Sequence, residues 1–273
     1  MVKLASAREA RQYGPALAVR RWEYINAGMY VFAALLLAAA LAAQSVGGGA
    51  RAGLAVAAVG LAIVTAVNAH DLAAHLVGVD CRVGLVRYDL QLGLVELLVP
   101  LLHALGCVLA VVGMAFLLSQ GEGAGYSHGR EKHAANTLLA AAILWLMGSV
   151  LNSCQVYERA DGRAQLLQSS VQIPLLLGSL LFLLAAFSNR RRVLEWRREP
   201  VLVGRNWACV CMFGSLLWLM GALFNMLKVF MMHQSDALRL EKLRGGAQER
   251  LSRGREDRVP LNWEEASRTT TLH

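Results

Sequence analysis

Six long apolar segments constrain the fold of this chain of 273 residues more than any other feature. A helix needs about 20 apolar residues to span the hydrocarbon core of a bilayer, and the segments lie at about 25–43, 54–75, 93–118, 136–157, 171–187 and 207–232. Hydrophobic residues make up 56% of the chain and charged residues only 17%. A soluble helical core would alternate apolar and polar residues with a period of 3.6, and stretches such as 35–43 do not. We therefore predict an all-α integral membrane bundle of six transmembrane helices.

Sequence repeats within these segments indicate three repeated helical hairpins. Residues 214–225 read Gly-Ser-Leu-Leu-Trp-Leu-Met-Gly-Ala-Leu-Phe-Asn and nearly repeat residues 178–189, while 144–152 resemble the end of the same pattern. We expect a glycine-rich turn at 47–49 between helices one and two, and a loop across 121–129 between helices three and four. An arginine-rich loop is expected to join helices five and six.

Glycine and proline positions refine this picture. Glycines seven residues apart return to nearly the same helix face, and small residues let helix backbones approach closely in lipid. Pro100 and Pro174 are both expected near the start of their helices, where a proline is tolerated. We predict that helix packing uses Gly106, Gly113, Gly148, Gly178, Gly214 and Gly221.

Charged residues divide the chain into three parts. They predict a basic N-terminal tail over 1–24, a transmembrane domain over 25–232 and a polar C-terminal tail over 233–273. Within the C-terminal tail, residues 235–244 have helical apolar spacing and Gly245–Gly246 indicates a stop. We expect a short surface helix followed by a disordered end. The first apolar segment is too long for a cleavable signal peptide, so we expect a retained anchor.

The distribution of positive charge predicts the orientation. With the N-terminus in the cytosol, 18 of the 27 Lys and Arg residues fall on the cytosolic side and nine on the other. The fifth loop disagrees, because it would place six arginines outside the cytosol, namely Arg190, Arg191, Arg192, Arg197, Arg198 and Arg205. The net charge of +8 lies in loops and tails, which argues against a nucleic-acid partner. The plasma membrane, an endomembrane and a plastid membrane all remain open.

Polar residues gather where three of the predicted helices end. Helix two ends with Asn68-Ala-His-Asp71, helix four with Asn152-Ser-Cys-Gln155 and helix six with Asn225-Met-Leu-Lys228. The other helices start from the same side of the bilayer and offer Asn26, Glu96, Ser170 and Gln172 there. Polar groups inside a membrane are expensive, which makes them functional candidates. We call the following residues the polar layer, and predict either a solute vestibule or an interhelical clamp: Asn68, Asp71, Glu96, Asn152, Gln155, Asn225 and Lys228.

The positions of the histidines and cysteines bear on metal and catalytic sites. His70 and His75 lie on helix two and His103 on helix three, whereas helices four and five contain no histidine opposite them. Transmembrane haem needs facing histidines, and a di-iron site needs several His and Asp clusters. The five cysteines lie mostly in apolar segments, and neither a nucleophile elbow nor a phosphate-binding loop occurs. We therefore expect no catalytic residue, metal or cofactor.

Three stretches carry a resemblance to a known family. They are Asn68-Ala-His-Asp71, the residues Asn-Ser-Cys-Gln-Val-Tyr-Glu-Arg at 152–159, and the segment 238–250. In these stretches the chain resembles a land-plant family of uncharacterised multi-pass membrane proteins, and the similarity covers most of its length. The resemblance implies a plant membrane setting and supplies no activity, catalytic residue or binding residue.

These observations favour a non-enzymatic multi-pass membrane protein and leave three functions open. A small solute carrier or channel-like bundle predicts a hydrated cleft that reaches the polar layer. A membrane scaffold or adaptor, whose C-terminal tail recruits a cytosolic protein, predicts a closed and dry interior. A transmembrane redox protein using His70, His75 and His103 predicts a cofactor between helices two and three.

Overall fold

The computed structural model describes residues 17–47, 49–78, 97–120, 127–153, 162–195 and 204–256. These residues form six long helices, namely α2 (Leu17–Ser45), α3 (Ala50–Gly78), α6 (Val99–Leu118), α7 (His128–Ser153), α8 (Gly162–Glu195) and α9 (Arg205–Glu256). Each helix contains a stretch that is long and apolar enough to cross a membrane. The described part of the chain is therefore all-α with six candidate membrane spans, as the sequence predicts.

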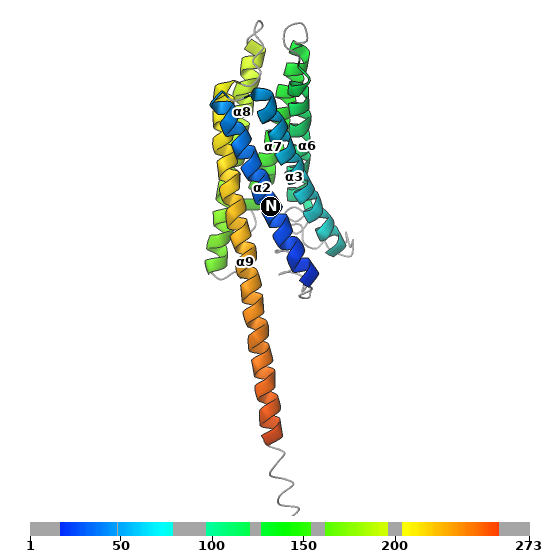
Figure 1. Cartoon of the computed structure of the whole chain (residues 1–273), viewed down its shortest axis with the longest axis vertical. Coiled ribbons are helices and arrows are strands. Elements are labelled where there is room, and N and C mark those ends of the chain that lie inside the picture. Colours follow the sequence, from blue (N-terminus) through cyan, green and yellow to red (C-terminus); the bar gives the residue numbers. More distant parts are fainter. Residues whose placement is uncertain are drawn as a thin grey trace, which may run out of the picture. The chain divides into compact units, whose positions relative to one another are not determined.

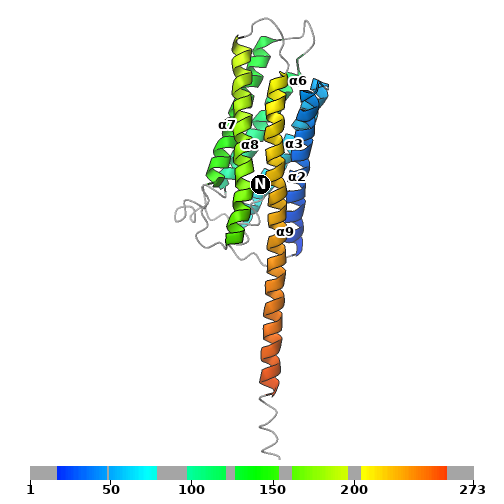
Figure 2. The ribbon, with the colours of Figure 1, turned by 90° about the vertical axis from the view of Figure 1, so that its left-hand side faces the viewer.

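The chain consists of two compact units, Met1–Val229 and Phe230–His273. In the first unit, helices that follow one another in the sequence also pack together, from α2 through α3, α6 and α7 to α8. The first part of α9 packs on α8 at Gly178 and Gly214, and its Met212 Sδ lies 3.8 Å from Ser45 Oγ at the end of α2. Neighbouring helices run in alternating directions (Figure 1; Figure 2).

Apolar side chains cover both the inside and the outside of this bundle. Large hydrophobic residues of α2 remain about half exposed at spacings of three and four residues, namely Trp22, Ile25, Met29, Phe32 and Leu35. The opposite side of the same helix packs into the core through Leu37 and Leu41. A helix that is apolar on all sides is typical of a membrane span.

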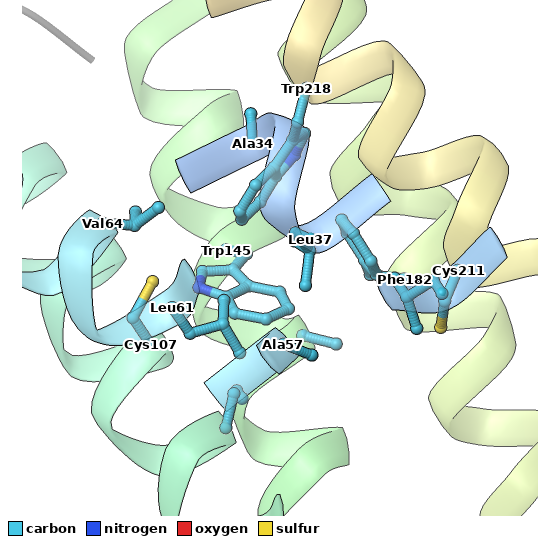
Figure 3. Close-up of a cluster of buried hydrophobic side chains, with 14 of the residues drawn as sticks. Ala34, Leu37, Ala57, Leu61, Val64, Cys107, Trp145, Phe182, Cys211 and Trp218 are labelled. Carbon is cyan, nitrogen blue, oxygen red and sulfur yellow. The ribbon is translucent and has the colours of Figure 1, made fainter. Parts of the chain in front are cut away.

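Three aromatic rings fill the core between α7, α8 and α9. The ring centroids of Trp145, Phe182 and Trp218 lie 4.9 to 5.3 Å apart, and each pair meets edge to face. Figure 3 shows Trp145 and Trp218 directed toward the middle of the bundle, where Leu37 and Leu61 meet them from α2 and α3.

Several helices extend beyond the predicted spans. α7 begins at His128 rather than near 136, and its first turn contains the acidic Glu131, whose charge suits the positive end of the helix dipole. α8 extends over Gly162–Glu195 rather than 171–187. Pro174 consequently lies inside α8 and not near its start, whereas Pro100 does lie in the first turn of α6. Membrane helices tolerate an internal proline because neighbouring groups satisfy the carbonyl that it frees.

The C-terminal helix also differs from the prediction. α9 continues to Glu256 and so passes through Gly245 and Gly246, where the sequence predicted a stop. A glycine inside a helix costs about 1 kcal/mol relative to alanine. The surrounding Leu, Glu, Lys, Arg, Ala and Gln are strong helix formers, and an existing helix gains one hydrogen bond per added residue. α2 likewise begins at Leu17, within the predicted basic tail, while 1–16 and 257–273 lie outside the described residues.

Arginines stabilise the end of the bundle at which α6 ends. Arg51, near the start of α3, donates hydrogen bonds to the carbonyl oxygens of Leu118 and Gln120 at 3.0 and 2.7 Å. Arg130 of α7 donates to the carbonyl of Ser119 at 3.0 Å. Positive side chains suit the negative end of a helix dipole. The turn between α2 and α3 uses Gly47 at φ 91°, a backbone conformation that favours glycine.

Candidate functional site

The asparagines of the polar layer face the interior of the bundle. Asn68, Asn152 and Asn225 are all buried, and Asp71 is 0% exposed. They lie toward the end of the bundle where α2 and α8 begin and where α3 and α7 end (Figure 1). Glu96 and Gln155 lie outside the described residues.

Asp71 makes a short contact with the neighbouring helix. The side-chain Nδ2 of Asn26 in α2 donates a hydrogen bond of 2.5 Å to Asp71 Oδ1 in α3. Both residues are buried, and a carboxylate in such surroundings needs hydrogen-bond donors. The contact therefore connects α2 and α3 through an ionisable group.

Lys228 makes the corresponding contact between α8 and α9. Its Nζ donates a hydrogen bond of 2.5 Å to Gln168 Oε1, which is buried near the start of α8. In both pairs of helices an amide side chain of the first helix meets a charged side chain of the second. The charge is negative at Asp71 and positive at Lys228.

The remaining asparagines have different surroundings. Gln172 of α8 donates from Nε2 to the backbone carbonyl of Asn152 in α7 at 2.7 Å, which connects these two helices. Asn68 Nδ2 donates to the carbonyl of Val64 in its own helix at 2.8 Å. Asn68 Oδ1 and Asn225 Nδ2 are buried without a hydrogen-bond partner among the described residues. The hydrogen-bonding groups of the polar layer are thus partly satisfied, mostly by contacts between helices.

A second buried polar network, which the sequence pattern does not predict, surrounds His103. His103 Nδ1 lies 3.0 Å from the Val99 carbonyl, which can only accept, so this nitrogen carries a proton. Ser149 Oγ lies 3.5 Å from His103 Nε2 and 2.9 Å from Ser179 Oγ. Trp218 Nε1 donates to Ser179 Oγ at 3.3 Å. The network therefore joins α6, α7, α8 and α9 within the apolar core.

Two further buried side chains lie at the same end of the bundle but are not part of the predicted polar layer. Glu23 is fully buried in α2, although the predicted tail included it, and Gln168 was not singled out. Helical spacing could have found both. Glu23 precedes Asn26 by three residues and Gln168 precedes Gln172 by four, so each pair shares a helix face.

The predicted packing glycines lie against neighbouring helices. A Cβ atom on Gly106 would lie 2.6 Å from the Trp145 ring, and one on Gly178 would lie 2.6 Å from the Trp218 ring. Gly148 and Gly221 likewise leave no room for a methyl group beside His103 and Leu175. The same tight contact occurs at Gly113, which faces Leu138, and at Gly214, which faces the Gly178 carbonyl.

The centre of the bundle is apolar and contains little free space. A cavity of about 30 Å³ lies there, and all six helices line it with apolar side chains: Leu37, Leu41, Leu61, Ala110, Met114, Leu138, Ala142, Trp145, Phe182, Ala186, Trp207 and Cys211. This volume is about that of one water molecule, and a water needs two or more polar partners to remain in a cavity. The lining of this cavity is almost wholly apolar, so it offers a hydrated solute few polar partners.

The histidines considered for a cofactor have separate surroundings. The His70 ring lies against Trp22 of α2, with ring centroids 5.7 Å apart, whereas His103 belongs to the serine network. The side chain of His75 lies outside the described part of the chain. Among the described side chains, no group of three or more His, Cys, Asp and Glu residues is arranged to hold a metal ion.

No protein-family model matches the chain, and no solved structure matches its fold.

Proposed function

We propose that this protein is a non-enzymatic membrane scaffold, in which a closed six-helix bundle holds a C-terminal segment that recruits a cytosolic partner. The observation that carries this proposal is the apolar centre, where all six helices contribute to a cavity of only about 30 Å³. A carrier needs a binding site near the bilayer midplane that polar groups line. Here Trp145, Phe182 and Trp218 pack together in the core, and the serines beside them bond to one another and to Trp218.

The polar layer then acts as an interhelical clamp. Asn26 bonds to Asp71, Gln168 to Lys228 and Gln172 to Asn152, so each contact joins two adjacent helices. Such bonds contribute on average about 0.6 kcal/mol each inside a membrane protein. Several of them along one end of the bundle fix which helices pair.

The clamp is best understood as part of three repeated hairpins. Gly106 against Trp145 and Gly178 against Trp218 support this view, because the two glycines are 72 residues apart and the two tryptophans 73. The offset of 73 residues also relates Asn152 to Asn225. The Asn26–Asp71 and Gln168–Lys228 contacts support the inclusion of the first hairpin.

The recruiting segment is the polar part that follows the sixth span. That span ends at Met231, and α9 continues to Glu256, which adds 25 residues or about 37 Å of helix. From Gln234 the sequence has eight Lys and Arg against seven Asp and Glu, so it suits a protein partner better than an anionic lipid surface. The full-length chain, used as bait, is expected to capture a cytosolic protein. Deletion of 234–273 from the bait is expected to abolish this capture. Unchanged capture would contradict the assignment to this segment.

A solute carrier is the second candidate, because Asp71 is fully buried and ionisable residues inside a membrane are often functional. Reconstituted vesicles distinguish the two functions. For a scaffold, proton and solute fluxes equal those of empty vesicles in both the wild type and Lys228→Met, while Lys228→Met lowers the unfolding temperature. A wild-type flux that Lys228→Met abolishes without unfolding the protein would favour the carrier.

A further inference from the structure

A groove lies on the outer surface of the helix pair α2 and α3. It has a volume of about 540 Å³ and lies between α2 and α3, lined by Trp22, Ile25, Asn26, Met29, Val59, Ala62, Ile63, Ala66, Val67 and His70. All ten residues belong to the candidate membrane spans, and Trp22, Ile25 and Val59 are each more than half exposed. We call this feature the lipid groove. Its volume is within the usual range of ligand sites, about 300 to 1,000 Å³.

The polar groups of the lipid groove lie at one end only. Trp22, Asn26 and His70 are near the start of α2 and the end of α3, which is the end of the bundle that also contains Asp71. From His70 to Val59 the groove extends eleven residues along α3, about 16 Å, or roughly half of the hydrocarbon core. An occupant would therefore lie within one leaflet, with its polar end near the interface.

The polar end of the lipid groove offers one donor and one acceptor. Asn26 uses Nδ2 to bind Asp71 Oδ1, which leaves its Oδ1 as an acceptor. His70 Nδ1 is enclosed and has no hydrogen-bond partner among the described residues, so its proton is less costly on Nε2. Neither Asn26 Oδ1 nor His70 Nε2 is fully enclosed. A hydroxyl group is a small neutral group that can accept from His70 and donate to Asn26 at the same time.

The rest of the lipid groove suits a rigid apolar body. None of its ten lining residues is Lys, Arg, Asp or Glu, so nothing in the lining matches a phosphate or a carboxylate. Ala62 and Ala66 are four residues apart and present a flat surface on α3, with β-branched Val59 and Ile63 beside them. We propose that the lipid groove binds a sterol, with the sterol hydroxyl between Asn26 and His70 and the ring system against Ala62 and Ala66. This site is independent of the scaffold function.

The test uses the full-length protein in phosphatidylcholine vesicles that contain a cholesterol analogue carrying a diazirine and an alkyne. Photolabelling is expected to fall in the presence of excess unlabelled cholesterol and to map to peptides of α2 and α3. Ala62→Leu combined with Ala66→Leu fills the groove and should reduce labelling at least tenfold. His70→Phe keeps the ring beside Trp22 but removes the donor, and should reduce labelling about fivefold, the value of one hydrogen bond.

Ala39→Leu is the matched control, because Ala39 is an exposed alanine of the α2 span that does not line the groove. It should label like the wild type. The proposal is overturned if the double leucine variant labels normally, or if unlabelled cholesterol does not compete. It is also overturned if a photoreactive phosphatidylcholine occupies the groove and cholesterol fails to displace it, or if Ala66→Cys forms a disulfide between two copies of the chain.

Discussion

At the residue scale, the side chain that faces a given residue decides its role more than its own type does. Gly178 and Gly28 are both glycines inside transmembrane helices. A Cβ on Gly178 would meet the Trp218 ring at 2.6 Å and the Gly214 carbonyl at 2.8 Å, whereas nothing lies within 4 Å of one on Gly28. Only the first glycine is required for close packing.

Replacement of Gly178 by alanine should therefore destabilise the protein. The added methyl meets backbone as well as a ring, and overpacking of this kind costs about 1 to 3 kcal/mol. Gly28→Ala should cause no loss, because the methyl enters open space and alanine favours the helix. Chemical unfolding in detergent micelles measures both. Equal stability of the two variants would contradict the tight α8–α9 contact.

Ser179 and Ser170 allow a similar comparison within α8. Ser179 Oγ accepts from Trp218 and lies 2.9 Å from Ser149 Oγ, whereas Ser170 Oγ donates to the Leu166 carbonyl of its own helix. Ser179→Ala leaves the buried Trp218 N–H without its acceptor, so we expect a loss of about 1 to 2 kcal/mol in unfolding free energy. Ser170→Ala should change it by less than about 0.5 kcal/mol. An unchanged unfolding free energy for Ser179→Ala would show that this network does not stabilise the protein.

The sequence predicts the charged residues of the polar layer but not the serine network, and the reason is physical. Asp71 and Lys228 are charged residues at the ends of apolar segments, so they are conspicuous and their helix faces follow from spacing. A serine inside an apolar segment usually satisfies itself on the carbonyl four residues earlier, as Ser179 also does with Leu175. Its additional contact with Ser149 depends on how α7 and α8 pack, which spacing does not reveal.

At the element scale, composition predicts the presence of a helix better than its ends. All six apolar segments correspond to helices, yet α8 extends beyond its predicted bounds at both ends and α9 continues to Glu256. The apolar segment marks the part of a helix that lipid requires. Polar residues can continue the same hydrogen-bond pattern on either side, so hydropathy does not detect where it stops.

The continuity of α9 gives a prediction at this scale. Leu238 and Ser252 lie on either side of Gly245 and Gly246, fourteen residues apart within the helix, which corresponds to about 21 Å. Spin labels on cysteines at these two positions, in an otherwise cysteine-free full-length chain, should give one narrow distance distribution by pulsed electron resonance. A broad distribution, or one centred well below this length, would indicate that the helix ends at the glycines as the sequence predicted.

At the scale of the whole molecule, the six-helix bundle is apolar both at its centre and on its outer surface. Phe182 is 6% exposed and contacts both central tryptophans, while Phe187 of the same helix is 49% exposed. Sequence patterns do not separate these two phenylalanines, because a membrane helix is apolar on the lipid side as well as on the core side. Burial within the bundle separates them.

This difference should appear in the stability of the bundle. Phe182→Ala leaves a cavity between Trp145 and Trp218 and should reduce the unfolding free energy by about 3 kcal/mol. Phe187→Ala should reduce it by less than about 1 kcal/mol, because lipid can fill the vacated space. Thermal unfolding in the same detergent tests both variants. A larger effect at Phe187 would contradict the position of the core.

Cys211 offers the most direct test of the closed interior. It is a buried free thiol that lines the central cavity, so in a variant without the other four cysteines it reports on that cavity alone. A small charged thiol reagent added to membranes that contain this variant should leave Cys211 unmodified until the protein is unfolded in dodecyl sulfate. Rapid modification in the native membrane would show that water reaches the centre, and would contradict a closed scaffold.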